Sequence, residues 1–192
     1  MSTIIGEDGR ARCAWVGGDL EYARYHDEEW GVPLHGDRPL FEKLSLEGFQ
    51  AGLSWISILR RRPGFRSAFH DFEPEAIAAF SDGDVERLML DDRIIRNRAK
   101  ILATIGNARA TLELTQGHPG ALDELMWSFA PAGPRPRPRS FADLAATTPE
   151  STAMSKALKA RGYRFVGPTT MHALMQSAGM VDDHVEGCWR AA

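Results

Sequence analysis

The 192-residue chain has only two cysteines, no long apolar run and no excess of positive charge. Two cysteines cannot build the multi-disulfide framework of a small secreted domain. No stretch approaches the roughly 18–20 apolar residues of a transmembrane helix, so we expect no membrane partner. The net charge of −3 does not point to nucleic acid, although binding depends on local patches and not on the total.

The chain begins MSTIIGEDGR, which contains no apolar signal-peptide core. We therefore expect a cytoplasmic protein, in which the cysteines would stay reduced. A length of 192 residues with 43% hydrophobic composition suits one domain spanning residues 1–192 with an ample core.

The spacing of apolar residues predicts a mostly helical chain with little strand signal and no repeats. We predict helices over residues 40–61, 73–80, 82–90, 93–114, 122–129, 154–161 and 169–178, the first of them stopped by Pro63 and Gly64. The segment APAGPRPRPR at residues 130–139 predicts a loop, and we expect it to be disordered.

Basic residues gather in four clusters, within residues 60–66, 93–100, 135–139 and 156–164. Any one such cluster is ordinarily a solvated helix face. Four of them in one small chain keep a polyanionic partner under consideration.

Each cysteine has a histidine nearby, so that Cys13 and His26 lie near one end and His184 and Cys188 near the other. Two cysteines and two histidines are a standard ligand set for tetrahedral zinc. Such a site would be structural, because four protein ligands leave no open position. The spacing is not that of a zinc finger, so inert buried thiols or a single disulfide remain alternatives.

Residues 155–179 read as a helix, a tight turn with Gly162 and Gly167 around Val166, and a second helix. This pattern resembles the helix-hairpin-helix element of DNA repair glycosylases. Glycines allow a close approach of the backbone, and the free N–H groups at the second helix's start can bind phosphate.

Four further segments occur in order, at residues 12–33, 46–62, 94–110 and 182–188. They read RCAWVGGDLEYARYHDEEWGVP, LEGFQAGLSWISILRRR, IIRNRAKILATIGNARA and DDHVEGC. Together with the hairpin they resemble the bacterial DNA-3-methyladenine glycosylase I family, over about residues 12–188. The resemblance implies an all-α helix-hairpin-helix DNA glycosylase fold, with a core at about 40–179.

The resemblance also implies a zinc-pinned subdomain made by the termini, at about residues 12–33 and 180–190. Cys13, His26, His184 and Cys188 would hold one structural zinc ion. The implied activity is release of 3-methyladenine from double-stranded DNA by base flipping, leaving an abasic site without a strand-cleavage step. We expect a monomer.

By the same resemblance Tyr25 and Trp55 line the base pocket, while Trp15 and Trp30 belong to the pocket or to the core. Stacking on such rings favours a flipped base. Glu47 would accept hydrogen bonds from the adenine edge, and a direct catalytic role for it stays open.

The expected DNA contacts lie in two places. Gln50 and Leu53 would fill the gap left by the flipped base, and Lys159, Arg161, Gly162 and Gly167 would hold phosphates. Two alternatives remain: an inactive DNA-binding module of the same fold, and a glycosylase with a different alkylpurine specificity.

Overall fold

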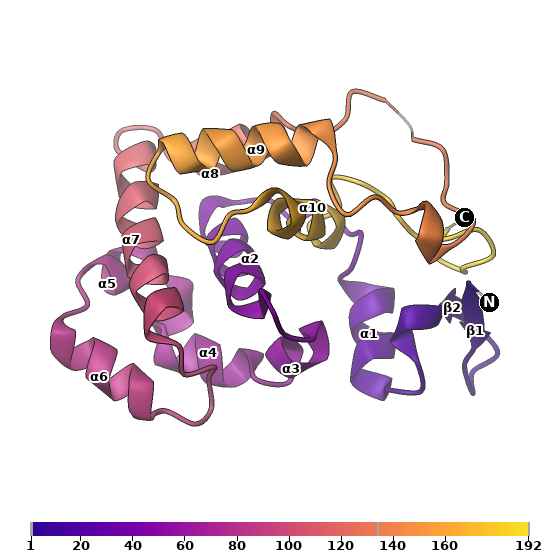
Figure 1. Ribbon diagram of the computed structural model, residues 1–192, viewed down its shortest axis with the longest axis horizontal. Coiled ribbons are helices and arrows are strands. Elements are labelled where there is room, and N and C mark those ends of the chain that lie inside the picture. The colour runs from indigo at the N-terminus through magenta and orange to yellow at the C-terminus, as the bar shows by residue number, and fades with distance from the viewer. Residues whose placement is uncertain (1, 134, 192) are drawn as a thin grey trace.

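Helix α2 (Asp37–Gln50) lies at the centre of a group of helices (Figure 1). The structure is a computed structural model and describes residues 2–133 and 135–191. Leu40, Phe41 and Leu44 of α2 are fully buried. Helices α7 (Arg98–Thr115) and α10 (Pro168–Ser177) pack against α2, so this helix contacts the core on several sides. A helix enclosed in this way is a rigid support for any side chain it carries.

The remaining helices surround this centre (Figure 1). They are α1 (Leu20–Glu28), α3 (Trp55–Leu59), α4 (Arg62–Ala68), α5 (Pro74–Ala78), α6 (Asp82–Leu90), α8 (Ala121–Trp127) and α9 (Pro149–Ala160), with short 3-10 helices at Ala14–Val16, His70–Phe72 and Phe141–Asp143. Ser81 caps the start of α6 in a capping box with Asp84. Helices α9 and α10 pack together as the predicted hairpin.

The single helix predicted over residues 40–61 is wrong, because the chain divides there into α2, a turn and α3. The backbone leaves the helical path at Ala51, whose ψ is 115°, and Gly52 continues the turn with a φ of 84° that favours glycine. Pro63 does not stop a helix either: it lies in the first turn of α4, where a missing N–H does no harm. Apolar spacing continued across these breaks and concealed them.

Two other boundaries differ from prediction. Helix α7 begins at Arg98 and not at residue 93, because the Asn97 side chain accepts the Lys100 N–H and caps the helix there. Helix α9 begins earlier than predicted, where Thr148 and Ser151 form a capping box.

The two ends of the chain lie together beside α1 (Figure 1). An antiparallel pair of strands that the sequence did not predict, β1 (Thr3–Ile5) and β2 (Ala11–Cys13), lies at the N-terminal end. The Trp189 N–H donates to the Ala11 carbonyl oxygen at 2.8 Å, which joins the C-terminal segment to β2. The fold is mostly helical, which confirms the all-α class, with this short hairpin added.

The loop after α8 reaches the same end of the molecule (Figure 1). Its residues 135–139 make specific contacts where we expected disorder. The Glu186 N–H donates to the Pro138 carbonyl oxygen at 2.8 Å, and Arg137 pairs with Asp182 at 3.1 Å. Within residues 2–133 and 135–191, no helix combines the length and apolar character needed to cross a membrane.

Candidate functional site

A cavity of about 340 Å³ opens between the N-terminal part of the chain and helices α2, α3 and α10. Its volume falls at the small end of the roughly 300–1,000 Å³ typical of small-molecule sites. The lining residues are mostly aromatic or apolar, with a few polar groups: Trp15, Tyr22, Tyr25, Trp30, Glu47, Gln50, Trp55, Phe141, Leu144, Ala173, Gln176 and Ser177. The structure thus brings every predicted pocket residue to one cavity.

The aromatic residues form a connected wall of rings. The Tyr25 and Trp55 ring centroids are 5.6 Å apart, and those of Trp15 and Trp30 are 5.3 Å apart in an edge-to-face arrangement. The hydroxyl of Tyr22, a lining residue missing from the prediction, accepts the Ile56 N–H at 3.0 Å. This bond fixes the start of α3, which carries Trp55.

Glu47 contributes the buried carboxylate of this cavity. Its side chain comes from the central helix α2, and the residue is 3% exposed. The Ser177 hydroxyl on α10 donates to a carboxylate oxygen of Glu47 at 3.0 Å. Burial raises the pKa of Glu47 from 4.5 to about 7, against opposing effects of Lys43 and of the Ser177 hydrogen bond. In its ionised form this carboxylate can accept hydrogen bonds from a ligand.

Lys43, one helical turn before Glu47, is a second buried charged group, and the sequence analysis missed it. Burial lowers its pKa, while the Glu47 carboxylate opposes that effect. Lysines are almost always exposed, so the residue type gave no signal of burial.

Gln50 is the last residue of α2, and Leu53 lies in the turn between α2 and α3. Gln50 lines the cavity, whereas Leu53 does not line it and is 41% exposed. The Lys100 ammonium donates to the carbonyl oxygens of Phe49 and Ala51, both at 2.7 Å, and so fixes this turn. An exposed leucine held by a rigid turn is available to an external partner.

Phe141 and Leu144 complete the cavity from the loop that precedes α9. The Ser140 and Asp143 side chains form a capping box that shapes this segment. Nothing in the sequence pattern placed Phe141 against a cavity formed by distant residues.

Lys159, Arg161 and Gly162 are exposed at the turn between α9 and α10. Gly162 has a φ of 86°, a conformation that favours glycine. Gly167 precedes α10 with a φ of −63°, and a Cβ there would meet no atom nearer than the Thr170 hydroxyl at 4.0 Å. The backbone and the neighbouring atoms at this position would therefore also accept a side chain.

Asn107 on α7 holds the hairpin to the rest of the molecule. Its amide accepts the Arg164 N–H at 2.8 Å and donates to the Arg164 carbonyl oxygen at 3.1 Å. Asn107 is buried, so breaking this pair of bonds would leave polar groups without partners. The sequence carried no sign of this role.

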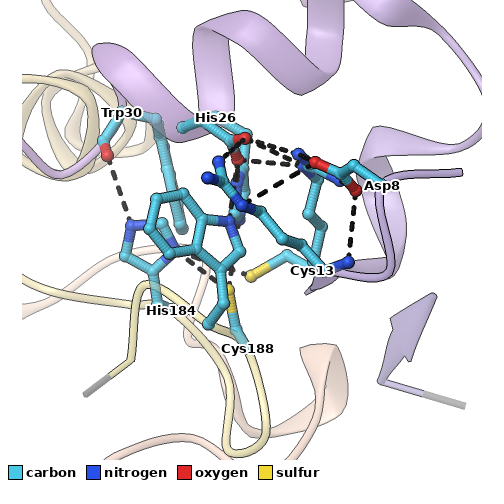
Figure 2. A network of polar contacts seen from close by, with 10 residues as sticks. Asp8, Cys13, His26, Trp30, His184 and Cys188 are labelled. Atoms are coloured by element: carbon cyan, nitrogen blue, oxygen red, sulfur yellow. Dashed lines mark hydrogen bonds and ion pairs between the residues drawn. The ribbon is translucent and has the colours of Figure 1, made fainter. Parts of the chain in front are cut away.

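Cys13, His26, His184 and Cys188 form one buried cluster, whose four candidate ligand atoms all lie within 4.8 Å of one another (Figure 2). The Cys188 sulfur is 3.4 Å from His26 Nε2 and 3.6 Å from His184 Nδ1, and the Cys13 sulfur is 3.8 Å from His184 Nδ1. The Cys13 thiol and the two imidazoles lower the pKa of Cys188, which favours the thiolate that binds metals. The cluster could hold a metal ion.

In each imidazole, the ring nitrogen that faces away from the cysteines has a polar partner elsewhere in the protein. His26 Nδ1 lies 2.8 Å from a carboxylate oxygen of Asp27. His184 Nε2 lies 3.3 Å from the Trp30 carbonyl oxygen (Figure 2). Arg12 in turn donates to both carboxylate oxygens of Asp27. Such bonds fix each ring's tautomer and leave the inner nitrogen free as a ligand.

Trp30 connects the cluster to the cavity. Its ring lies edge-to-face against the His184 ring with centroids 4.6 Å apart, and it also lines the cavity. The cluster therefore supports one wall of the cavity but does not open into it.

The structure combines a helical hairpin with an aromatic cavity that contains a buried carboxylate. The chain has the fold of the helix-hairpin-helix DNA glycosylases. A model of the methyladenine glycosylase family matches residues 15–191. The chain belongs to this family.

Several relatives are similar along nearly their whole length. The DNA-3-methyladenine glycosylase 1 of Escherichia coli is 48% identical over 92% of this chain and 95% of its own. The crystal structure of a 3-methyladenine DNA glycosylase I superposes with a TM-score of 0.89 at 47% identity, covering 93% of this chain and 98% of that one. The Staphylococcus aureus enzyme, solved to show the structural basis of 3-methyladenine recognition, has a TM-score of 0.86 at 35% identity, covering 93% and 95%.

Proposed function

We propose that this protein is a DNA glycosylase that flips 3-methyladenine out of alkylated double-stranded DNA and releases it by hydrolysis. The observation that carries the proposal is the cavity in which Glu47 meets the rings of Tyr25 and Trp55. Relatives named for this activity, similar over more than nine-tenths of the chain, support the same conclusion.

Cleavage of the bond between this base and its sugar needs little help from a general acid. Alkylation at N3 places a positive charge on the base, which departs from the sugar as a neutral molecule. The enzyme's task is to extract and hold the damaged nucleotide, and aromatic stacking is worth about 1–3 kcal/mol per base. A cationic base gains a further attraction to the faces of Tyr25 and Trp55. Trp15 and Trp30 hold these rings in place and close the cavity.

We assign Glu47 to recognition of the base. An ionised carboxylate accepts hydrogen bonds and attracts a cation, and Glu47 is the acidic residue among the cavity's lining side chains. No described lysine lines the cavity, which supports a monofunctional enzyme that leaves an abasic site without cutting the strand.

DNA would lie across the cavity's opening. Leu53 would enter the gap left by the flipped nucleotide, with Gln50 beside it at the cavity's edge. Lys159, Arg161 and the backbone at Gly162 and Gly167 would contact phosphates of the flanking duplex.

We assign zinc to the Cys13, His26, His184 and Cys188 cluster. Zinc bonds of about 2.3 Å to sulfur and about 2.0–2.1 Å to nitrogen, at a tetrahedral angle, separate the two ligand atoms by about 3.6 Å. The sulfur–nitrogen separations of 3.4, 3.6 and 3.8 Å agree with this value. With four protein ligands the ion would be structural and would join the two ends of the chain.

The same proposal treats residues 1–192 as one glycosylase domain acting as a cytoplasmic monomer. Trp55 contacts both hydrophobic clusters of the molecule, the helical core and the smaller cluster around Cys13 and Tyr25. This shared contact supports a single unit.

Base release from N-methylated duplex DNA tests the function, with the freed base identified by chromatography and mass. We expect 3-methyladenine from the zinc-loaded protein. Release of 3-methylguanine in its place would favour the alternative specificity. DNA binding without release of any base would overturn the proposal and favour a binding module.

A further inference from the structure

Lys43 is a buried cation with no hydrogen bond to any described residue. It is 8% exposed and lies on α2, one turn before Glu47. An ammonium that is largely removed from water and has no protein acceptor is unfavourable unless nearby charges compensate for lost hydration. Its surroundings therefore indicate what it does.

The ammonium lies behind the aromatic wall of the cavity. The Lys43 nitrogen is 5.3 Å from the centre of the Tyr25 ring and 5.6 Å from that of Trp55, within the range of cation–π attraction. Lys43 does not line the large cavity but a smaller one of about 210 Å³, and Ser177 lines both. A ligand in the large cavity would therefore meet the rings of Tyr25 and Trp55 and not the Lys43 side chain.

The other carboxylates that face Lys43 are paired with arginines. Glu29, after α1, accepts from Arg62 of α4 at 2.8 Å, and Glu42 of α2 accepts from Arg66 at 2.8 Å. Glu47 has no arginine partner among the described residues; it accepts from the Ser177 hydroxyl of α10 and faces the Tyr25 phenol of α1. Lys43 and Glu47 are thus left as each other's main charge partners.

We propose that Lys43 is a positioning residue, which favours the ionised form of the Glu47 carboxylate, so that a larger share of the protein presents an acceptor to the alkylated base. The proposal rests on the function proposed above. A protonated Glu47 would keep one oxygen occupied as a donor and would lose its attraction for a cationic base. Lys43 supplies the compensating charge from behind the wall, where it does not exclude the base.

Carbon-13 NMR of labelled glutamate carboxyl groups tests this in the protein without DNA. Glu47 would be assigned from the signal lost in Glu47→Gln. We compare the parent with Lys43→Met, which keeps an unbranched stem, and with Arg38→Met, which removes one charge from an exposed position on the same helix. The Glu47 midpoint should rise by about one pH unit or more in Lys43→Met. It should stay unchanged in Arg38→Met.

The same variants are then compared in base release from methylated DNA between pH 6 and 9. The pH midpoint at which the rate rises should increase by a similar amount in Lys43→Met alone. Most of the rate should be recovered at high pH. A merely structural role for Lys43 would lower the rate at every pH without changing this midpoint. If Lys43→Met does not fold, the neutral Lys43→Gln takes its place.

An unchanged titration midpoint of Glu47 in folded Lys43→Met or Lys43→Gln would overturn the proposed role of Lys43. The NMR result does not depend on catalysis. A shifted midpoint in a protein that releases no base would therefore remove the proposed function and leave the Lys43–Glu47 coupling standing.

Discussion

Replacing Glu47 with glutamine should stabilise the protein in a pH-dependent way. Burial raises the pKa of this carboxyl from 4.5 to about 7. A raised folded-state pKa means that the protonated form is favoured in the fold. The stability associated with that form is therefore complete below pH 4.5 and is lost as pH rises through 7.

The magnitude follows from the size of the shift. At about 1.4 kcal/mol per pKa unit, an ionised Glu47 costs about 3 kcal/mol of folding free energy above pH 8 and less than about 1 kcal/mol at pH 5. Glutamine can still accept from Ser177, so only the charge is removed. Because Lys43 loses an opposing charge in this variant, about 3 kcal/mol is the largest gain expected.

Urea unfolding of parent and Glu47→Gln at pH 5 and pH 8.5 measures this difference. The variant's advantage should be about 2 kcal/mol larger at the higher pH. Glu75→Gln, which removes the same charge from an exposed position on α5, should show no such change. An equal advantage for Glu47→Gln at both pH values would refute the inference of a raised pKa.

Three further outcomes follow from the structure. Trp55→Ala should weaken binding of 3-methyladenine by about 1–3 kcal/mol in a fluorescence titration, whereas Trp127→Ala, outside the cavity, should not; equal losses would argue against stacking on Trp55. Cys188→Ser should lower bound zinc below one ion per chain by mass spectrometry and lower the melting temperature by about 8–16 °C, for a loss of about 4 kcal/mol; undiminished zinc content would contradict the ligand assignment. Asn107→Ala should weaken binding to undamaged duplex in fluorescence anisotropy, because the hairpin loses two bonds to Arg164, while affinity for the free base stays unchanged; unaltered duplex binding would separate the hairpin from the DNA contact.

The rarity of cysteine drew attention to the cysteine–histidine cluster, and the family resemblance then made a zinc site the expectation over buried thiols or a disulfide. Only two cysteines exist, each with a histidine near it, and Cys13 and His184 meet although 171 positions separate them. The family resemblance then pointed to Tyr25, Glu47 and Trp55, which the fold brings to one cavity.

Features that depend on tertiary contact were not predictable from the pattern. Lys43 looks like any surface lysine until Tyr25 of α1 and Trp55 of α3 lie over it, and Phe141 meets the cavity only because its loop crosses to α1 and α10. The break at Gly52 was concealed because apolar residues keep helical spacing on both sides of it. The three-residue strand β1 is too short to show an alternating pattern.

The most direct test of the account is 3-methyladenine release from methylated duplex by the parent, Glu47→Ala, Trp55→Ala and Trp127→Ala, compared in one assay. The account predicts release by the parent and Trp127→Ala, and strongly reduced release by the two cavity variants. Undiminished release by folded Glu47→Ala and Trp55→Ala would contradict the assignment of this cavity as the place where the base is held.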